Sequence, residues 1–140
     1  HPTLVAFTPW TTINDYVATV EFFRAHGLVS YVPPVQLSVR LLVPPHSALL
    51  AEADTGSWAG PLDPGTFSHP WRHPDPRMDE LFEQVASRVE SAEDAGEDPR
   101  ETWDAVRALA YAAAGRPLPD EAMPPVFVPD PPRLTEHWFC

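Results

Sequence analysis

Prolines divide this sequence into a few stretches in which regular structure can form. The chain has 140 residues and 19 of them are prolines, against an average usage of about 5%. Proline has no backbone N–H and disrupts helix interiors and central strands. We therefore expect much of the chain to be ordered loop. The prolines cluster as Pro33-Pro34, Pro44-Pro45, Pro124-Pro125, Pro131-Pro132 and a run from Pro61 to Pro76.

The first 54 residues are predicted to form a strand–helix–strand unit and a short helix. Residues 3–8, TLVAFT, are apolar and rich in β-formers, which is typical of a buried strand. Residues 13–26 follow a capping-box spacing, keep apolar side chains at helical intervals and stop at a glycine, so they are predicted as a helix. Residues 34–45, PVQLSVRLLVPP, are predicted as a second strand, and residues 47–54 as a short helix.

This order predicts one βαβ unit with a right-handed crossover. A parallel sheet is normally covered on both faces, and two strands cannot provide that. The sequence therefore predicts an exposed sheet edge. Either the proline-rich tail would cover this edge, or a second copy would cover it and the protein would associate with itself.

The remainder of the chain is predicted to be a loop, a helix hairpin and a tail. Residues 55–75 form a proline-rich loop, and loops of this length are often functional. Residues 76–115 contain two helices that start with Asp-Pro and end at a glycine, so we expect an antiparallel hairpin. Residues 116–140 form a proline-rich tail. The predicted fold class is α+β: a βαβ unit, a helix hairpin and irregular segments.

Charge and composition exclude several classes of partner. The net charge is −11, and every basic side chain is an arginine. A protein that binds nucleic acids or anionic membranes needs clustered cations on its surface, and the sequence has no basic patch. No apolar run approaches the roughly 20 residues of a membrane span, and no signal-peptide pattern is visible. With a single cysteine, a reducing compartment, the cytoplasm, is expected.

Few side chains are candidates for chemistry. Gln36 and Arg40 lie on one face of the predicted second strand and could face a ligand, although Arg40 could equally pair with a carboxylate. His69 and His73 are four residues apart, but the neighbouring prolines argue against a helix, so these and His46 are interpreted as loop histidines and no metal site is expected. The acidic residues between 90 and 104 are interpreted as a solvated helix surface.

The end of the chain, PPRLTEHWFC, contains the only cysteine, Cys140. Cys140 with His137 could form a nucleophile pair, but no third orienting group is identifiable. A free-standing thiol protein that uses Cys140 is the weakest of the functional readings. It would require a depressed thiol pKa.

The sequence also resembles radical S-adenosylmethionine enzymes. Residues 3–28 and 34–50 are similar to the last barrel strands and helix of that family, so the resemblance implies that residues 1–54 form the end of a barrel. The tail is similar to that of a subgroup ending in Cys-Cys-Ala-Glu-Pro or Cys-selenocysteine-Ala-Glu-Pro. The resemblance implies that Cys140 matches the first residue of that pair. A UGA codon read as stop, or truncation, would leave a chain ending there.

Enzymes of that family hold an iron–sulfur cluster with a CxxxCxxC motif, which one cysteine cannot supply. The resemblance therefore implies a C-terminal fragment that closes the barrel and is inactive alone. The N-terminal remainder of the enzyme would be its partner and would bring the iron–sulfur cluster and S-adenosylmethionine. The alternative is a small protein-interaction module, whose helix hairpin and proline-rich segments bind a partner.

Overall fold

The computed structural model describes residues 3–120 and shows an all-α protein. Three α-helices are present: α1 (Ile13–Ala25), α2 (Pro76–Ala95) and α3 (Pro99–Ala113). Four 3-10 turns precede α2: η1 (Val29–Tyr31), η2 (Pro34–Ser38), η3 (Ala48–Ala51) and η4 (Thr55–Ser57). No β-strand occurs within residues 3–120, so the predicted α+β class and its βαβ unit are wrong.

The two predicted strands meet at a single residue pair. Phe7 and Arg40 form an isolated parallel bridge, in which the Phe7 N–H donates to Val39 O at 3.0 Å and the Leu41 N–H donates to Phe7 O at 2.8 Å. Pairing goes no further because Pro33 and Pro34 turn the chain into η2, which takes up the first half of the expected second strand. Within the described residues there is consequently no sheet edge through which self-association could occur.

Helix α1 begins as the sequence predicts. The Thr12 side chain accepts a hydrogen bond from the Asp15 N–H, and the Asp15 carboxylate accepts one from the Thr12 N–H at 3.0 Å. These two bonds complete a capping box. The chain turns after the helix at Gly27, whose φ of 65° lies in the left-handed region that favours glycine.

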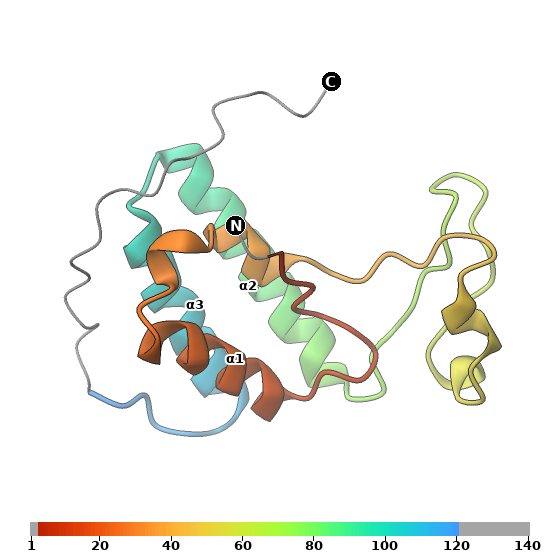
Figure 1. Ribbon diagram of the computed structural model, residues 1–140, viewed down its shortest axis with the longest axis horizontal. Helices are drawn as coiled ribbons and strands as arrows, with labels where there is room; N and C mark the ends of the chain where they lie inside the picture. The colour runs from red at the N-terminus through yellow and green to blue at the C-terminus, as the bar shows by residue number, and fades with distance from the viewer. Residues whose placement is uncertain (1–2, 121–140) are drawn as a thin grey trace.

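Helices α2 and α3 form the expected hairpin, with α3 beside α1 (Figure 1). The carboxylates of Asp75 and Asp98 accept hydrogen bonds from Arg77 N–H at 3.1 Å and Arg100 N–H at 2.9 Å, so both helix starts are capped. The apolar stripes of α2 and α3 face one another, and α3 also packs against α1. Their buried members are Met78, Leu81, Val85, Val89 and Ala92 on α2, and Trp103, Val106, Ala110 and Tyr111 on α3.

Two buried hydrogen bonds attach the segment after α1 to the helices. The Trp103 indole N–H donates to Val32 O at 2.9 Å. The Tyr16 hydroxyl donates to Leu37 O at 2.9 Å, and burial raises the pKa of Tyr16 well above its usual value, so this group stays a neutral donor. Each bond satisfies a carbonyl that is removed from water, so the 3-10 turns η1 and η2 can cover the core.

Residues 42–72, here called the lobe, extend from one end of the helical body (Figure 1). The helix predicted at residues 47–54 is only the short turn η3, whose cap is Ser47. Antiparallel bridges at Ala59–Trp71 and Asp63–Ser68 hold the lobe together. The Gly60 N–H donates to Pro70 O at 2.7 Å, and a Cβ at Gly60 would lie 2.9 Å from that oxygen, so this close approach requires glycine.

Candidate functional site

The predicted site residue Arg40 lies where the lobe joins helix α2. Its Nη2 donates to the backbone oxygen of Trp71 and to Asp79 Oδ1, both at 2.8 Å. Its guanidinium also stacks over the ring of Trp71, 3.8 Å from the centroid, and lies 4.8 Å from the ring centroid of Phe82. A planar guanidinium suits such a position, since it can stack and donate at once.

A pocket of about 460 Å³ opens beside this arginine. The chain segments around residues 40–43 and 68–72 form two sides of it, and α2 contributes Asp79, Phe82 and Glu83. The cations Arg40 and Arg72 are matched there by the carboxylates of Asp79 and Glu83. Because the charges balance, the pocket lacks the excess positive charge that anion binding requires. Since Arg40 donates at once to Trp71 of the lobe and to Asp79 of α2, it acts as a clamp between the two.

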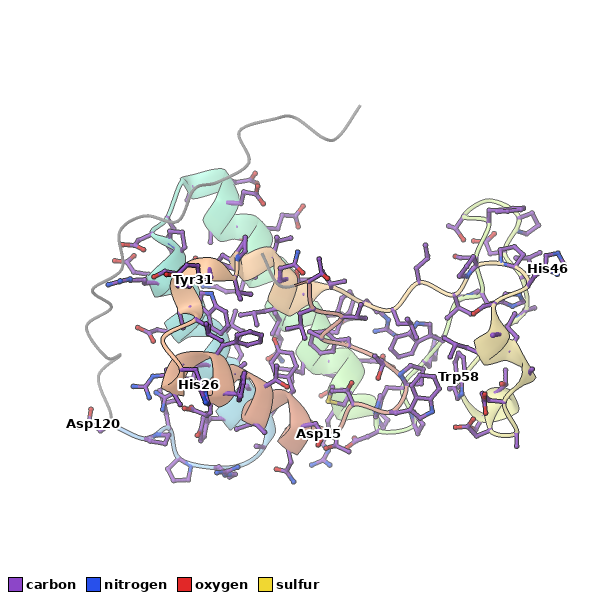
Figure 2. The ribbon with its side chains drawn as sticks, viewed as in Figure 1. Asp15, His26, Tyr31, His46, Trp58 and Asp120 are labelled. Carbon is purple, nitrogen blue, oxygen red and sulfur yellow. The ribbon has the colours of Figure 1, made fainter. Side chains whose placement is uncertain are left out.

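Two of the three predicted loop histidines, His69 and His73, make separate backbone contacts. His69 Nδ1 donates to Gly60 O at 2.9 Å, because a carbonyl can only accept. His73 Nδ1 accepts from the Asp75 N–H at 2.9 Å, and its Nε2 is buried without a hydrogen-bond partner. His46 lies at the outer end of the lobe (Figure 2). In the part of the chain that the structure describes, no three His, Cys, Asp or Glu side chains are placed to hold a metal ion.

Gln36 and Arg40 are not brought together on one face as predicted. Gln36 lies in η2 rather than on a strand, and its Oε1 accepts a hydrogen bond from the Leu4 N–H at 3.0 Å. It does not line the Arg40 pocket. Of the two readings of Arg40, the pairing with a carboxylate is the one the geometry shows. Cys140 and His137 lie outside the described residues.

Sequence reasoning missed the partners of Arg40. Trp71 and Asp79 are 31 and 39 residues away in the chain. Trp71 stands between prolines in a predicted loop, and Asp79 resembles any acidic residue in a first helical turn. A tryptophan between prolines in a long loop is the available signal, since tryptophan is usually well buried. The structure shows that Trp71 is buried and that its indole N–H donates to Leu41 O at 2.7 Å.

The comparisons with known proteins give no family for this chain. No protein-family model, curated protein or solved structure matches it. Among residues 3–120, no helix combines the length and apolar character that crossing a membrane requires.

Proposed function

We propose that this chain is the C-terminal region of a radical S-adenosylmethionine enzyme and that it works by docking on the N-terminal remainder of that enzyme. Barrel closure by strands forms no part of this proposal, because the expected strands are absent from residues 3–120. The sequence resemblance and one structural observation support it. That observation is the exposure of large apolar side chains on the two segments that meet at the Phe7–Arg40 bridge.

The exposed apolar residues flank the bridge on both chain segments. Val5 and Trp10, on the first segment, are 46% and 45% exposed, and Leu42, on the second, is 70% exposed. Single exposed apolar residues are ordinary, but several on adjoining segments indicate a surface that a partner covers. In the proposed enzyme this partner is the remainder of the same protein.

The proposal divides the chemistry between the two parts. The remainder would hold the iron–sulfur cluster through its own cysteines and would also bind S-adenosylmethionine, in the cytoplasm, where thiols stay reduced. This chain would supply a docking surface and, through the tail that contains Cys140, a thiol.

The test begins with the DNA on both sides of this reading frame. The proposal expects an in-frame CxxxCxxC-coding region upstream, and it fails if none is found. The two parts are then co-expressed with an affinity tag on the N-terminal part, and co-purification of this chain is measured.

Variants locate the contact. Val5→Asp with Leu42→Asp should abolish co-purification, because both charges would be buried without partners. Phe67→Asp is the matched control: Phe67 is 71% exposed, lies elsewhere in the lobe and has a φ of 50°, which aspartate tolerates. Equal recovery of the double variant and the unsubstituted chain would contradict the proposed docking surface.

A further inference from the structure

A groove of about 310 Å³ crosses the closed end of the α2–α3 hairpin. One wall is the start of η2, and the other is formed by the last turns of α2 and the first turn of α3. The floor and walls are mainly apolar, contributed by Pro33, Pro34, Val35, Val89, Ala92 and Pro99. This groove lies on helices and on a proline-stiffened turn, so its shape is set before any partner arrives.

The rim of the groove is acidic. Glu93 and Glu97 lie on it. Glu97 is paired with Arg88, whereas the carboxylate of Glu93 is exposed and can pair with a cation of a ligand. Among residues 3–120, further exposed carboxylates surround this end of the hairpin, at Glu90, Asp94, Asp98 and Glu101, against one exposed cation, Arg100. The local field is therefore negative, in a chain whose net charge is −11.

We propose that this groove binds a short peptide segment of a protein partner in which an aliphatic side chain is flanked by arginine or lysine. The apolar floor suits the aliphatic side chain, and the acidic rim suits the flanking cations. Complementary charge also speeds encounter and rejects acidic segments. This proposal does not depend on the assignment to a radical enzyme, because it concerns a different surface from the one around Val5 and Leu42.

Val35 is the residue on which the contact depends most. It is 46% exposed, although it stands directly after two prolines in a turn whose other apolar residue, Leu37, is fully buried. A peptide side chain in the groove would cover Val35 and remove apolar surface from water. Because Pro33 and Pro34 already fix the backbone, little ordering entropy opposes this step.

The test uses the chain labelled with ¹⁵N and two peptides, acetyl-Arg-Arg-Leu-Leu-Arg-Arg-amide and its counterpart with glutamate in place of arginine. The basic peptide should produce saturable changes in amide chemical shift confined to Val35 and to the non-proline residues between 89 and 102, and the acidic peptide should produce none. Equal effects of both peptides, changes outside these residues, or no change with either would overturn the proposal.

Matched variants test separately how the apolar floor and the acidic rim contribute to peptide binding. Val35→Ser should weaken binding of the basic peptide about five- to twentyfold, and Glu93→Gln about two- to fivefold with a smaller dependence on salt. Leu118→Ser and Glu80→Gln are the controls and should bind normally. Leu118 is also 46% exposed, and Glu80 is an exposed carboxylate earlier on α2. Circular dichroism verifies that each variant is folded. Normal binding by folded Val35→Ser would refute the groove as the site.

Discussion

Arg40 and Asp79 are 39 residues apart in sequence, yet Arg40 Nη2 lies 2.8 Å from Asp79 Oδ1. The second oxygen of Asp79 accepts the His73 N–H at 3.1 Å, so one carboxylate holds both the bridge segment and the chain that enters α2. The Trp71 ring covers the guanidinium. This cluster is the main polar connection between the lobe and the helical body, and it assigns Arg40 a structural role.

A double-mutant cycle of Arg40→Ala and Asp79→Ala should give a coupling energy of about 1 kcal/mol in the free energy of unfolding, because both side chains are partly shielded from water. Arg40→Lys should also destabilise the protein, since an ammonium cannot stack on Trp71 and donate twice in the same way. Denaturant unfolding measures each variant. The comparison pair is Arg77 and Asp75, where Arg77 is 66% exposed and the coupling should be smaller. A coupling near zero for Arg40 and Asp79 would contradict the clamp.

The sequence predicts the hairpin well because its signals are local. Asp75-Pro76 and Asp98-Pro99 each place a cap acceptor before a proline that suits the first turn, and Gly96 supplies the left-handed residue, with a φ of 63°, at the end of α2. A capping box starts α1 in the same way. None of these features requires knowledge of what the helix packs against, so the helix boundaries follow from a few neighbouring residues.

The prediction of two strands is wrong because strand formation depends on hydrogen-bonding partners that are distant in the sequence. Residues 3–8 and 34–45 have the apolar pattern of strands, but hydrogen bonds between them form only at Phe7 and Arg40. Pro33 and Pro34 favour the turn η2, and that local preference prevails where no neighbouring strand competes. For a related reason, the sequence predicts Arg40 as a site residue but does not predict the residues that it contacts. Its position could be selected from the pattern, but Trp71 and Asp79 come from a loop and a helix that the sequence does not connect with it.

Trp103→Phe should destabilise the protein by about 1–3 kcal/mol, because the Val32 carbonyl would lose its buried donor. Trp103 is 2% exposed and Val32 is 1% exposed, so water cannot replace the indole N–H. The control is Trp10→Phe. Trp10 is 45% exposed and donates to Asp54 Oδ2 at 3.0 Å in solvent, so its loss should have little effect. Thermal and denaturant unfolding compare the two, and equal effects would show that the Val32 bond is unimportant.

Asp98→Ala should reduce stability by about 1 kcal/mol, because α3 would lose the acceptor for its Arg100 N–H. Asp98→Asn should stay close to the unsubstituted protein, since an amide oxygen caps a helix equally well. The free energy of unfolding from urea titration distinguishes the two variants. If Asp98→Asn destabilises as much as Asp98→Ala, the charge at this position matters rather than the hydrogen bond.

Acid should weaken the protein through the pair formed by Glu97 and Arg88. The hydrogen bond from Arg88, and beyond it the Arg88 charge and the Thr102 hydroxyl, hold the pKa of Glu97 below its usual value of 4.5. The unfolded chain therefore takes up the proton first as pH falls. The contribution of Glu97 to stability is complete above pH 4.5 and is lost as pH drops to the lower pKa of the folded state.

In Glu97→Gln this contribution is absent at every pH, so the free energy of unfolding should fall less steeply between neutral pH and pH 3 than in the unsubstituted protein. Protonation also relieves the repulsion between carboxylates in a chain of net charge −11. The informative quantity is therefore the difference between the two proteins in the slope of the free energy of unfolding against pH. Glu90→Gln removes an exposed carboxylate from the same helix and controls for that general effect. If the free energy of unfolding fell equally steeply with decreasing pH in Glu97→Gln and in the unsubstituted protein, the pair with Arg88 would not persist in solution.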